Sequence, residues 1–172
     1  MNNNRYLDNL ITTNQQVVAL TIAPMKVLLG IQIADVQFDS LLTELLRFAI
    51  EKVERRTEVF LSRRDVEIPF TNWSGDLQLI GGGVMSGLTV QDLNSTPIAF
   101  TIVNAFRINV ISKVPFTVKY QAGQAVLSED LRQAALAIVD IKFNVKEIDE
   151  QEDKINVVLR GLSRYINASR RL

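Results

Sequence analysis

The chain of 172 residues contains no cysteine and no histidine. Without thiol or imidazole groups it cannot form disulfides, thiolate nucleophiles, histidine general bases or zinc sites built from nitrogen or sulfur ligands. We therefore expect no enzyme and no metal or cofactor site. Carboxylates, hydroxyls and lysines still leave a metal-dependent nuclease or a glycosidase chemically open, but no paired constellation of such residues is visible.

The chain also lacks net charge and long apolar runs. Lysine plus arginine equals aspartate plus glutamate at 19 each, so the overall charge gives no reason to expect tight nucleic-acid binding. No apolar run reaches the roughly 18 residues that a membrane span requires, and the first residues do not have the pattern of a secretory signal. We expect a soluble protein that is made in the cytoplasm.

Apolar residues are nevertheless abundant enough to build a core. Hydrophobic residues make up 47% of the chain and charged residues 22%, close to the average of soluble globular proteins. A chain of this length fits one domain. We therefore predict a single domain over residues 1–172, with residues 1–20 as a polar N-terminal arm.

Helical periodicity marks the N-terminal part of the chain. A short helix is predicted where Thr21 caps, Pro24 lies in the first turn and Gly30 ends the helix. Residues 38–61 predict a long amphipathic helix, because apolar residues recur there at spacings of three and four. These residues are Leu42, Leu45, Leu46, Ala49, Val53 and Phe60.

Two more helices are predicted after residue 127. The first begins at Ser128, which can cap, while Glu129 and Asp130 place negative charge against the helix dipole. Residues 147–153 read as an acidic linker, and residues 153–172 as the C-terminal helix. The linker lacks the glycine turn and the ligand order of an EF-hand loop, so we expect solvated carboxylates there and not a calcium site.

Between residues 66 and 123 the apolar period changes to two, which predicts strands. Residues 72–96 are rich in glycine, serine and asparagine, so we expect turns, short strands and a long hairpin or exposed loop there. The predicted class is α+β: a mainly helical bundle of two N-terminal and two C-terminal helices, with a central antiparallel sheet or hairpin inserted. The helices should pack against that sheet, since neither is stable alone.

One stretch resembles the family of tailed-bacteriophage head–tail connector proteins. In that family a strand ending in a Tyr-x-x-Gly turn leads into a helix opened by an acidic pair and Leu-Arg/Lys-x-Ala. The family usually has proline where Ser128 stands. The matching residues are Val118-Lys119-Tyr120-Gln121-Ala122-Gly123 and Ser128-Glu129-Asp130-Leu131-Arg132-Gln133-Ala134.

The resemblance extends to most of the chain. Residues 26–29 are similar to the family's early short helix, residues 42–61 to its long helix, and residues 158–165 to its last helix. Residues 72–104 have no counterpart in the family.

The resemblance implies a structural virion protein of the phage neck, made in the host cytoplasm. It implies a dodecameric ring beneath the portal protein and above a stopper or tail-completion protein. The genome would be packaged and ejected through the lumen, without sequence-specific DNA binding and without a membrane. The alternative is a small monomeric adaptor or assembly-chaperone module that forms no ring.

Glycine and arginine residues are the first candidates for partner contacts. Gly81, Gly82 and Gly83 are not followed by the Lys-Ser or Lys-Thr of a phosphate-binding loop. They form either a flexible tip directed at the lumen or a partner, or a plain mobile loop. Near the C-terminus, a basic edge formed by Arg160, Arg164, Arg170 and Arg171 faces portal acids or DNA in one interpretation. In the other, its cations are solvated and favoured there by the helix dipole.

Trp73 is the remaining candidate. It is the only tryptophan of the chain and lies in a turn-rich segment. Tryptophan is common both in small satellite cores and as an anchor in subunit interfaces. Both interpretations stay open.

Overall fold

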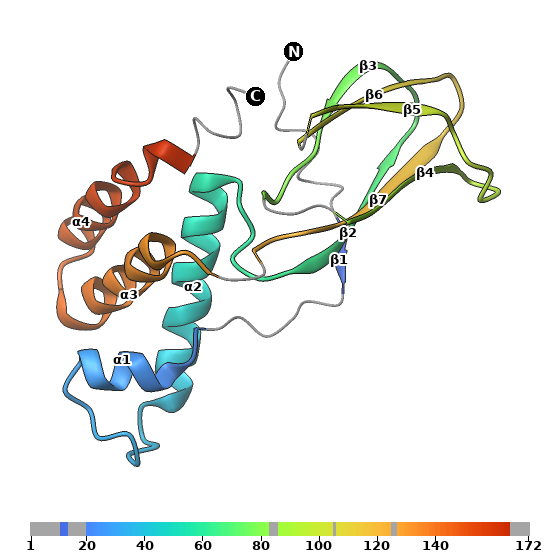
Figure 1. Ribbon diagram of the computed structural model, residues 1–172. Helices are drawn as coiled ribbons and strands as arrows, with labels where there is room; N and C mark the ends of the chain where they lie inside the picture. Colours follow the sequence, from blue (N-terminus) through green and yellow to red (C-terminus); the bar gives the residue numbers. More distant parts are fainter. Residues whose placement is uncertain (1–10, 14–19, 83–85, 105, 125–126, 166–172) are drawn as a thin grey trace. The chain divides into compact units, whose positions relative to one another are not determined.

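The computed structural model describes residues 11–13, 20–82, 86–104, 106–124 and 127–165. They form two compact units, a helical unit within Val18–Leu61 and Val126–Arg171 and a β unit within Met1–Val17 and Ser62–Ala125. The described residues form four helices and seven strands, which are labelled in Figure 1. The α+β class is therefore confirmed, and the predicted β region falls inside the β unit. That all of these residues form one connector domain stays a prediction.

The helical unit contains both predicted pairs of helices. They are α1 (Ile22–Leu28), α2 (Asp39–Thr57), α3 (Glu129–Asn144) and α4 (Ile148–Arg160). Gly30, with φ +69°, ends α1 as predicted, because glycine enters the left-handed region without steric cost. None of the described helices is long and apolar enough to cross a bilayer.

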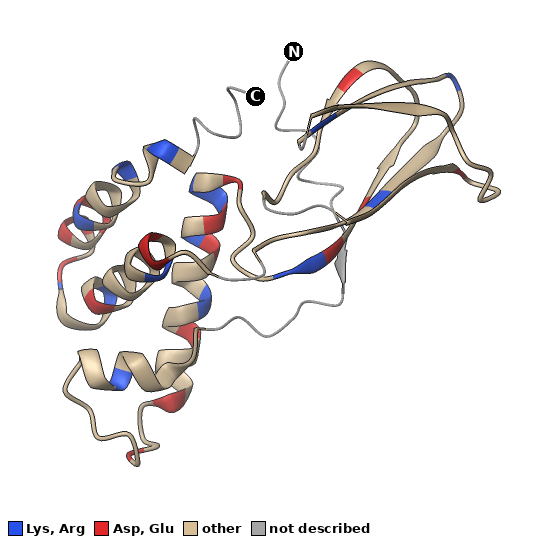
Figure 2. Ribbon diagram, in the orientation of Figure 1, with Lys and Arg blue, Asp and Glu red and all other residues tan. Residues whose placement is uncertain are grey.

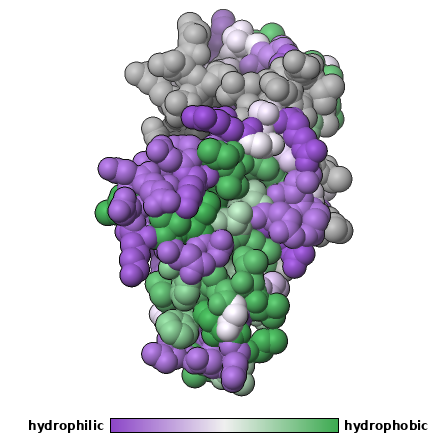
Figure 3. Space-filling model, turned by 90° about the vertical axis from the view of Figure 1, so that its left-hand side faces the viewer, coloured by the Kyte–Doolittle hydropathy of each residue, from purple (hydrophilic) through white to green (hydrophobic). Residues whose placement is uncertain are grey.

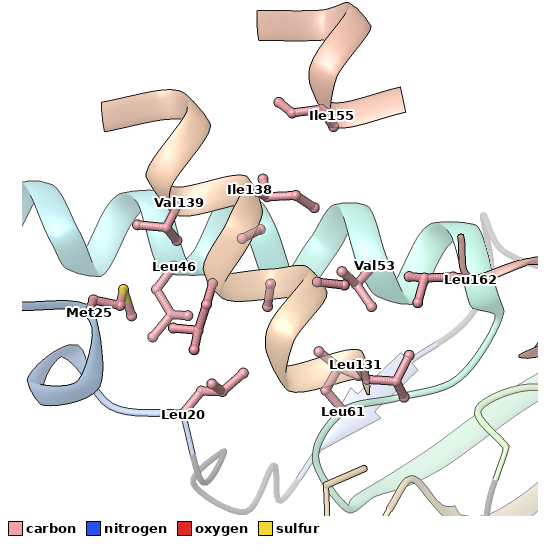
Figure 4. Packing of buried hydrophobic residues seen from close by; sticks show 14 of the residues in the cluster. Leu20, Met25, Leu46, Val53, Leu61, Leu131, Ile138, Val139, Ile155 and Leu162 are labelled. Atoms are coloured by element: carbon pink, nitrogen blue, oxygen red, sulfur yellow. The ribbon is translucent and has the colours of Figure 1, made fainter. Parts of the chain in front are cut away.

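Packing of the helical unit follows the apolar stripe of α2. Leu42, Ala49 and Val53 on this stripe are fully buried, while Glu44 and Arg47 on the opposite face are exposed. Figure 4 shows how α3 and α4 contribute to the same cluster. Its buried members include Met25, Leu46, Leu131, Ile138, Val139, Ile155 and Leu162.

The prediction of a linker over residues 147–153 is wrong, because most of this segment is helical. Helix α4 already begins at Ile148, because Asp149 and Glu150 in its first turn are favoured by the helix dipole. Glu150 and Lys154 form an ion pair at 2.7 Å. They are four residues apart, a spacing at which opposite charges stabilise a helix. The expected exposure of the carboxylates is confirmed for all five, Glu147, Asp149, Glu150, Glu152 and Asp153.

The β unit consists of two antiparallel sheets. One sheet has the order β1-β2-β7-β4 and the other β3-β6-β5. The strands are β1 (Ile11–Thr13), β2 (Arg64–Phe70), β3 (Trp73–Gln78), β4 (Ser86–Asp92), β5 (Phe100–Asn104), β6 (Arg107–Ser112) and β7 (Phe116–Ala122). Of the predicted N-terminal arm, only β1 and Leu20 are among the described residues.

The glycine-rich region is more regular than we predicted. Strands β3 and β4 occupy much of residues 72–96, where we expected turns to dominate. Leu77 pairs with Ile108 and Val90 with Val118, and all four side chains are buried. Burial of these cross-strand pairs outweighs the low strand propensity of the glycines and serines around them.

The sheets have a core of their own. Buried residues alternate along β2 and β7, as expected for strands that bury one face. The core cluster of the helical unit contains no residue of either sheet. Each unit thus buries an apolar stripe of its own, and the packing of the helices against the sheet stays a prediction.

Candidate assembly surfaces

The motif that resembles the connector family is a structural junction of the β unit. The Tyr120 side chain is 3% exposed. Its hydroxyl donates to the Ile80 carbonyl and accepts from the Ile80 N–H, both at 3.0 Å. Burial raises the pKa of the Tyr120 phenol above its ordinary value, against the opposing effect of the Ile80 hydrogen bond. Tyr120 therefore holds the end of β3 against β7 as a neutral group.

Gly123, the glycine of the same motif, occupies a place where no side chain fits. Its φ is +108°, and a Cβ there would overlap the Ser62 carbonyl and lie 2.9 Å from the Arg63 Cα. The Gly123 N–H donates to the Gly82 carbonyl at 3.0 Å. The strand must leave the sheet here beside the chain that enters it, and only glycine permits this approach.

Ser128 and Asp130 form the second half of the motif, in the helical unit. Ser128 is the N-cap of α3, and its Oγ accepts from the Leu131 N–H at 3.5 Å. The Tyr165 hydroxyl lies 2.9 Å from Ser128 Oγ and donates to Asp130 Oδ2 at 3.0 Å. Arg164 forms an ion pair with Asp130. The start of α3 is thus fastened to the segment after α4, in addition to the predicted cap.

Glu129 also has local partners at the start of α3. The Gln133 side chain donates to it at 2.6 Å, and Arg132 donates to both of its carboxylate oxygens at 3.1 Å. These hydrogen bonds, Gln133 first, lower the pKa of Glu129. Glu129 lies in the first turn of α3, as predicted, and no cluster of three or more metal-ligating side chains occurs among the described residues.

The basic edge is only partly available to a partner. Arg160 is exposed at the end of α4, whereas Arg164 pairs with Asp130 and lies over the Tyr165 ring at 5.4 Å. Arg170 and Arg171 lie outside the described residues. Figure 2 shows charges of both signs interspersed along α3 and α4, so the described helices carry no broad basic surface of the kind that binds DNA.

The predicted glycine tip is buried where the structure describes it. Gly81 and Gly82 are both buried, with φ of +108° and +57°, and Gly83 lies outside the described residues. The prediction of a projecting tip is therefore wrong for Gly81 and Gly82. Their backbone follows the Ile80 anchor, and the Gly82 carbonyl accepts from the Gly123 N–H. The positive φ of both residues explains the need for glycine.

Trp73 belongs to a small aromatic cluster. Its ring centroid lies 5.7 Å from that of Phe70, and Phe70 stacks on Phe116 at 5.1 Å. Its indole N–H donates to the Gly75 carbonyl at 3.2 Å. The residue is half-buried, so it packs as a satellite of the core and keeps an exposed edge.

Sequence reasoning missed a buried lysine. The Lys26 side chain is 4% exposed and lies 2.5 Å from Asp39 Oδ1. Its ammonium also donates to the carbonyls of Ile33 and Asp35, at 3.0 and 2.6 Å. The ion pair and the two hydrogen bonds together fix the loop between α1 and α2. The available signal was a single lysine within the apolar run Met25–Leu29, close to two aspartates.

No protein-family model matches the chain, and no curated protein sequence matches it. Two solved structures are similar in fold. One is a chain from the neck of an empty gene transfer agent (GTA) particle computed with C6 symmetry. It is 19% identical with a TM-score of 0.64, and the match covers 80% of this chain and 85% of that one. The other is from the virion of a native GTA particle, 21% identical with a TM-score of 0.59, covering 81% and 86%. The chain therefore shares its fold with proteins built into the neck and the virion of a gene transfer agent particle.

Proposed function

We propose that the chain is a structural subunit of a virion neck, namely a head–tail connector of a tailed bacteriophage. The observation that carries this proposal is the fold shared over most of both chains with a protein of the GTA neck. The motif at residues 118–134 supports it separately, because that resemblance depends on residue types and not on the fold. The residues of the motif also have defined structural roles at Tyr120, Gly123 and Ser128.

In this role the subunits form a ring between the portal and a stopper or tail-completion protein. A ring of twelve copies contains the six-fold axis with which the similar neck structure was computed. DNA passes through the lumen without sequence-specific contacts, for which a chain of zero formal net charge is suited. The work is mechanical, so it requires no reactive side chain.

Arg160 is the part of the basic edge that we assign to the portal. It is exposed and lies in the last turn of α4. Arg160→Glu should weaken portal binding, whereas Arg47→Glu, the same charge change at a 77% exposed position of α2, should not. Deleting residues 153–172 would be a poorer test, because it removes Ile155 and Leu162 from the core and so disturbs folding.

The decisive experiment is co-purification with the portal protein of the same virion, followed by negative-stain microscopy. Rings of this protein stacked on the portal are the expected result. A protein that binds the portal as a monomer and never forms rings would favour the adaptor or assembly-chaperone alternative. A protein that neither binds the portal nor enters virions would refute a neck function altogether.

A further inference from the structure

The corner between α1 and α2 exposes a cluster of aliphatic side chains. We call these five residues the apolar corner: Val27 at 66% exposure, Leu28 at 52%, Ile33 at 63%, Val36 at 73% and Leu41 at 49%. Figure 3 shows apolar side chains gathered on a face of the helical unit, in the lower half of the view. Neighbouring exposed apolar residues of this kind mark a contact with another protein.

The apolar corner contains few charges and is held in shape. The only charged residues in segment 27–41 are Asp35 and Asp39. Asp39 pairs with the buried Lys26, and the Asp35 side chain accepts from the Gln37 N–H at 2.9 Å. Because Lys26 also binds the carbonyls of the loop, a partner need not order the corner on binding. Its occupant should therefore present an uncharged aliphatic surface.

The β unit has such a surface at β5. This strand, Phe-Thr-Ile-Val-Asn, is an edge of its sheet and contains no charge and no proline. Ile102 is 63% exposed and Val103 48%; we call these two residues the β5 edge. Proteins usually protect such edges with charges, prolines or a covering segment, and no described residue pairs with β5 except those of β6.

Other exposed apolar residues of the β unit are isolated. Leu93 and Val114 are exposed in turns, where they adjoin the charged residues Asp92 and Lys113. Ile111 lies opposite Ser74 on β3. Single exposed apolar side chains in polar surroundings are ordinary, so the β5 edge is the better match for the apolar corner.

We propose that the apolar corner of one copy packs on the β5 edge of the next copy, so that copies associate head to tail. This inference rests on the proposed function, because a closed ring of identical subunits uses two different surfaces of each copy. The two surfaces lie on different units of the chain and are both aliphatic, and β5 contains no charge. The six-fold symmetry of the similar neck structure is consistent with head-to-tail closure.

Two single variants and their controls test the contact. Val36→Asp places a charge in the apolar corner, and Gln37→Asp is its control at the next exposed position. Ile102→Asp alters the β5 edge, and Thr101→Asp is its exposed neighbour. Light scattering and sedimentation should find rings for the wild type and both controls, and monomers for Val36→Asp and Ile102→Asp. Far-UV circular dichroism checks that every variant is folded.

Mixing the two variants tests the pairing itself. Val36→Asp keeps an intact β5 edge and Ile102→Asp keeps an intact corner, so an equimolar mixture should form dimers and nothing larger. A mixture that remains monomeric, or a single variant that assembles like the wild type, would overturn the pairing. If a variant does not fold, oxidation of the double variant Val36→Cys, Ile102→Cys replaces this test. The chain has no native cysteine, so a ladder of covalent multimers supports the contact and its absence overturns it.

The outcomes separate this inference from the proposed function. Rings that form equally well from all four variants would leave the connector function intact and refute only the contact between corner and β5 edge. A wild-type protein that stays monomeric even with the portal would refute both.

Discussion

Lys26 Nζ lies 2.5 Å from Asp39 Oδ1 across the corner between α1 and α2. The Lys26 side chain is 4% exposed and the Asp39 side chain is 34% exposed. The same ammonium binds two loop carbonyls. The contact therefore ties together the loop and the ends of both helices. Its removal would leave several polar groups without their partner at a partly closed site.

Lys26→Met is expected to destabilise the helical unit by about 3 kcal/mol, because it leaves the Asp39 carboxylate without its cation and two part-buried carbonyl oxygens without a donor. Urea unfolding followed by far-UV circular dichroism measures the change. Lys146→Met, at an exposed lysine of the same unit, is the control and should change stability by no more than about 0.5 kcal/mol. Equal effects of the two substitutions would contradict the role given to Lys26.

Gly123→Ala should destabilise the β unit by at least about 3 kcal/mol, because the new Cβ would overlap the Ser62 backbone. The alanine would also have to adopt a positive φ, which strains its backbone. Gly87→Ala is the matched control: its φ is +66°, but nothing lies within 4 Å of the added Cβ. It should cost only about 1 kcal/mol, from backbone strain alone. The fluorescence of Trp73, the only tryptophan, reports unfolding of this unit. Similar losses in both variants would rule out the steric argument.

Because of Tyr120, the free energy of unfolding should decrease at high pH. Its pKa is raised in the folded protein, so above its unfolded pKa of about 10 the folded state holds a proton that the unfolded state has lost. The stabilisation is thus complete below about pH 10 and is lost as the pH rises from there towards the folded pKa.

Tyr120→Phe should therefore cost about 1–3 kcal/mol at neutral pH, by removing both hydrogen bonds to Ile80, and should reduce the loss of stability above pH 10. Trp73 fluorescence in urea at pH 8 and pH 10.5 measures both effects. Lysines also contribute to the pH dependence, but the wild type and the Tyr120→Phe variant have the same lysines. If the two proteins lost stability equally over this range, Tyr120 would not be the group responsible.

Tyr165→Phe should destabilise the helical unit by about 1 kcal/mol, because the lost hydroxyl contacts both Ser128 and Asp130 at the start of α3. Arg164→Gln removes only an ion pair between largely exposed groups, and should cost about 0.5 kcal/mol or less. Thermal unfolding by circular dichroism compares them. A larger effect of Arg164→Gln would mean that the charge, and not the hydroxyl, secures the segment after α4.

The sequence predicts those elements in which a local pattern and burial agree. The stripe of α2 from Leu42 to Val53 and the Ser128 cap of α3 are of this kind. Helix α2 ends at Thr57, however, so Phe60 of the predicted stripe lies beyond it. The extent of strands β3 and β4 was underestimated because their stability comes from partners far away in sequence, as in the pairing of Leu77 with Ile108. The start of α4 was missed because exposed carboxylates suit a solvated linker and a first helical turn equally well.

The candidate surfaces were harder to predict than the fold. Gly81 and Gly82 look like an exposed tip in sequence, yet they are buried because β7 and its Gly123 lie against them. Conversely, Val36 and Ile102 look like core residues and are exposed. Hydropathy alone cannot separate an apolar residue that packs inside its own chain from one left for another chain.

The close approach of Gly123 to Ser62 places the entry and exit of the main part of the β unit side by side. A segment whose ends meet can be lengthened, shortened or exchanged without pulling α2 and α3 apart. Among the described residues, the three of β1 join it from elsewhere in the chain. The junction thus makes the main part of the β unit a module that can vary while the helical core stays the same.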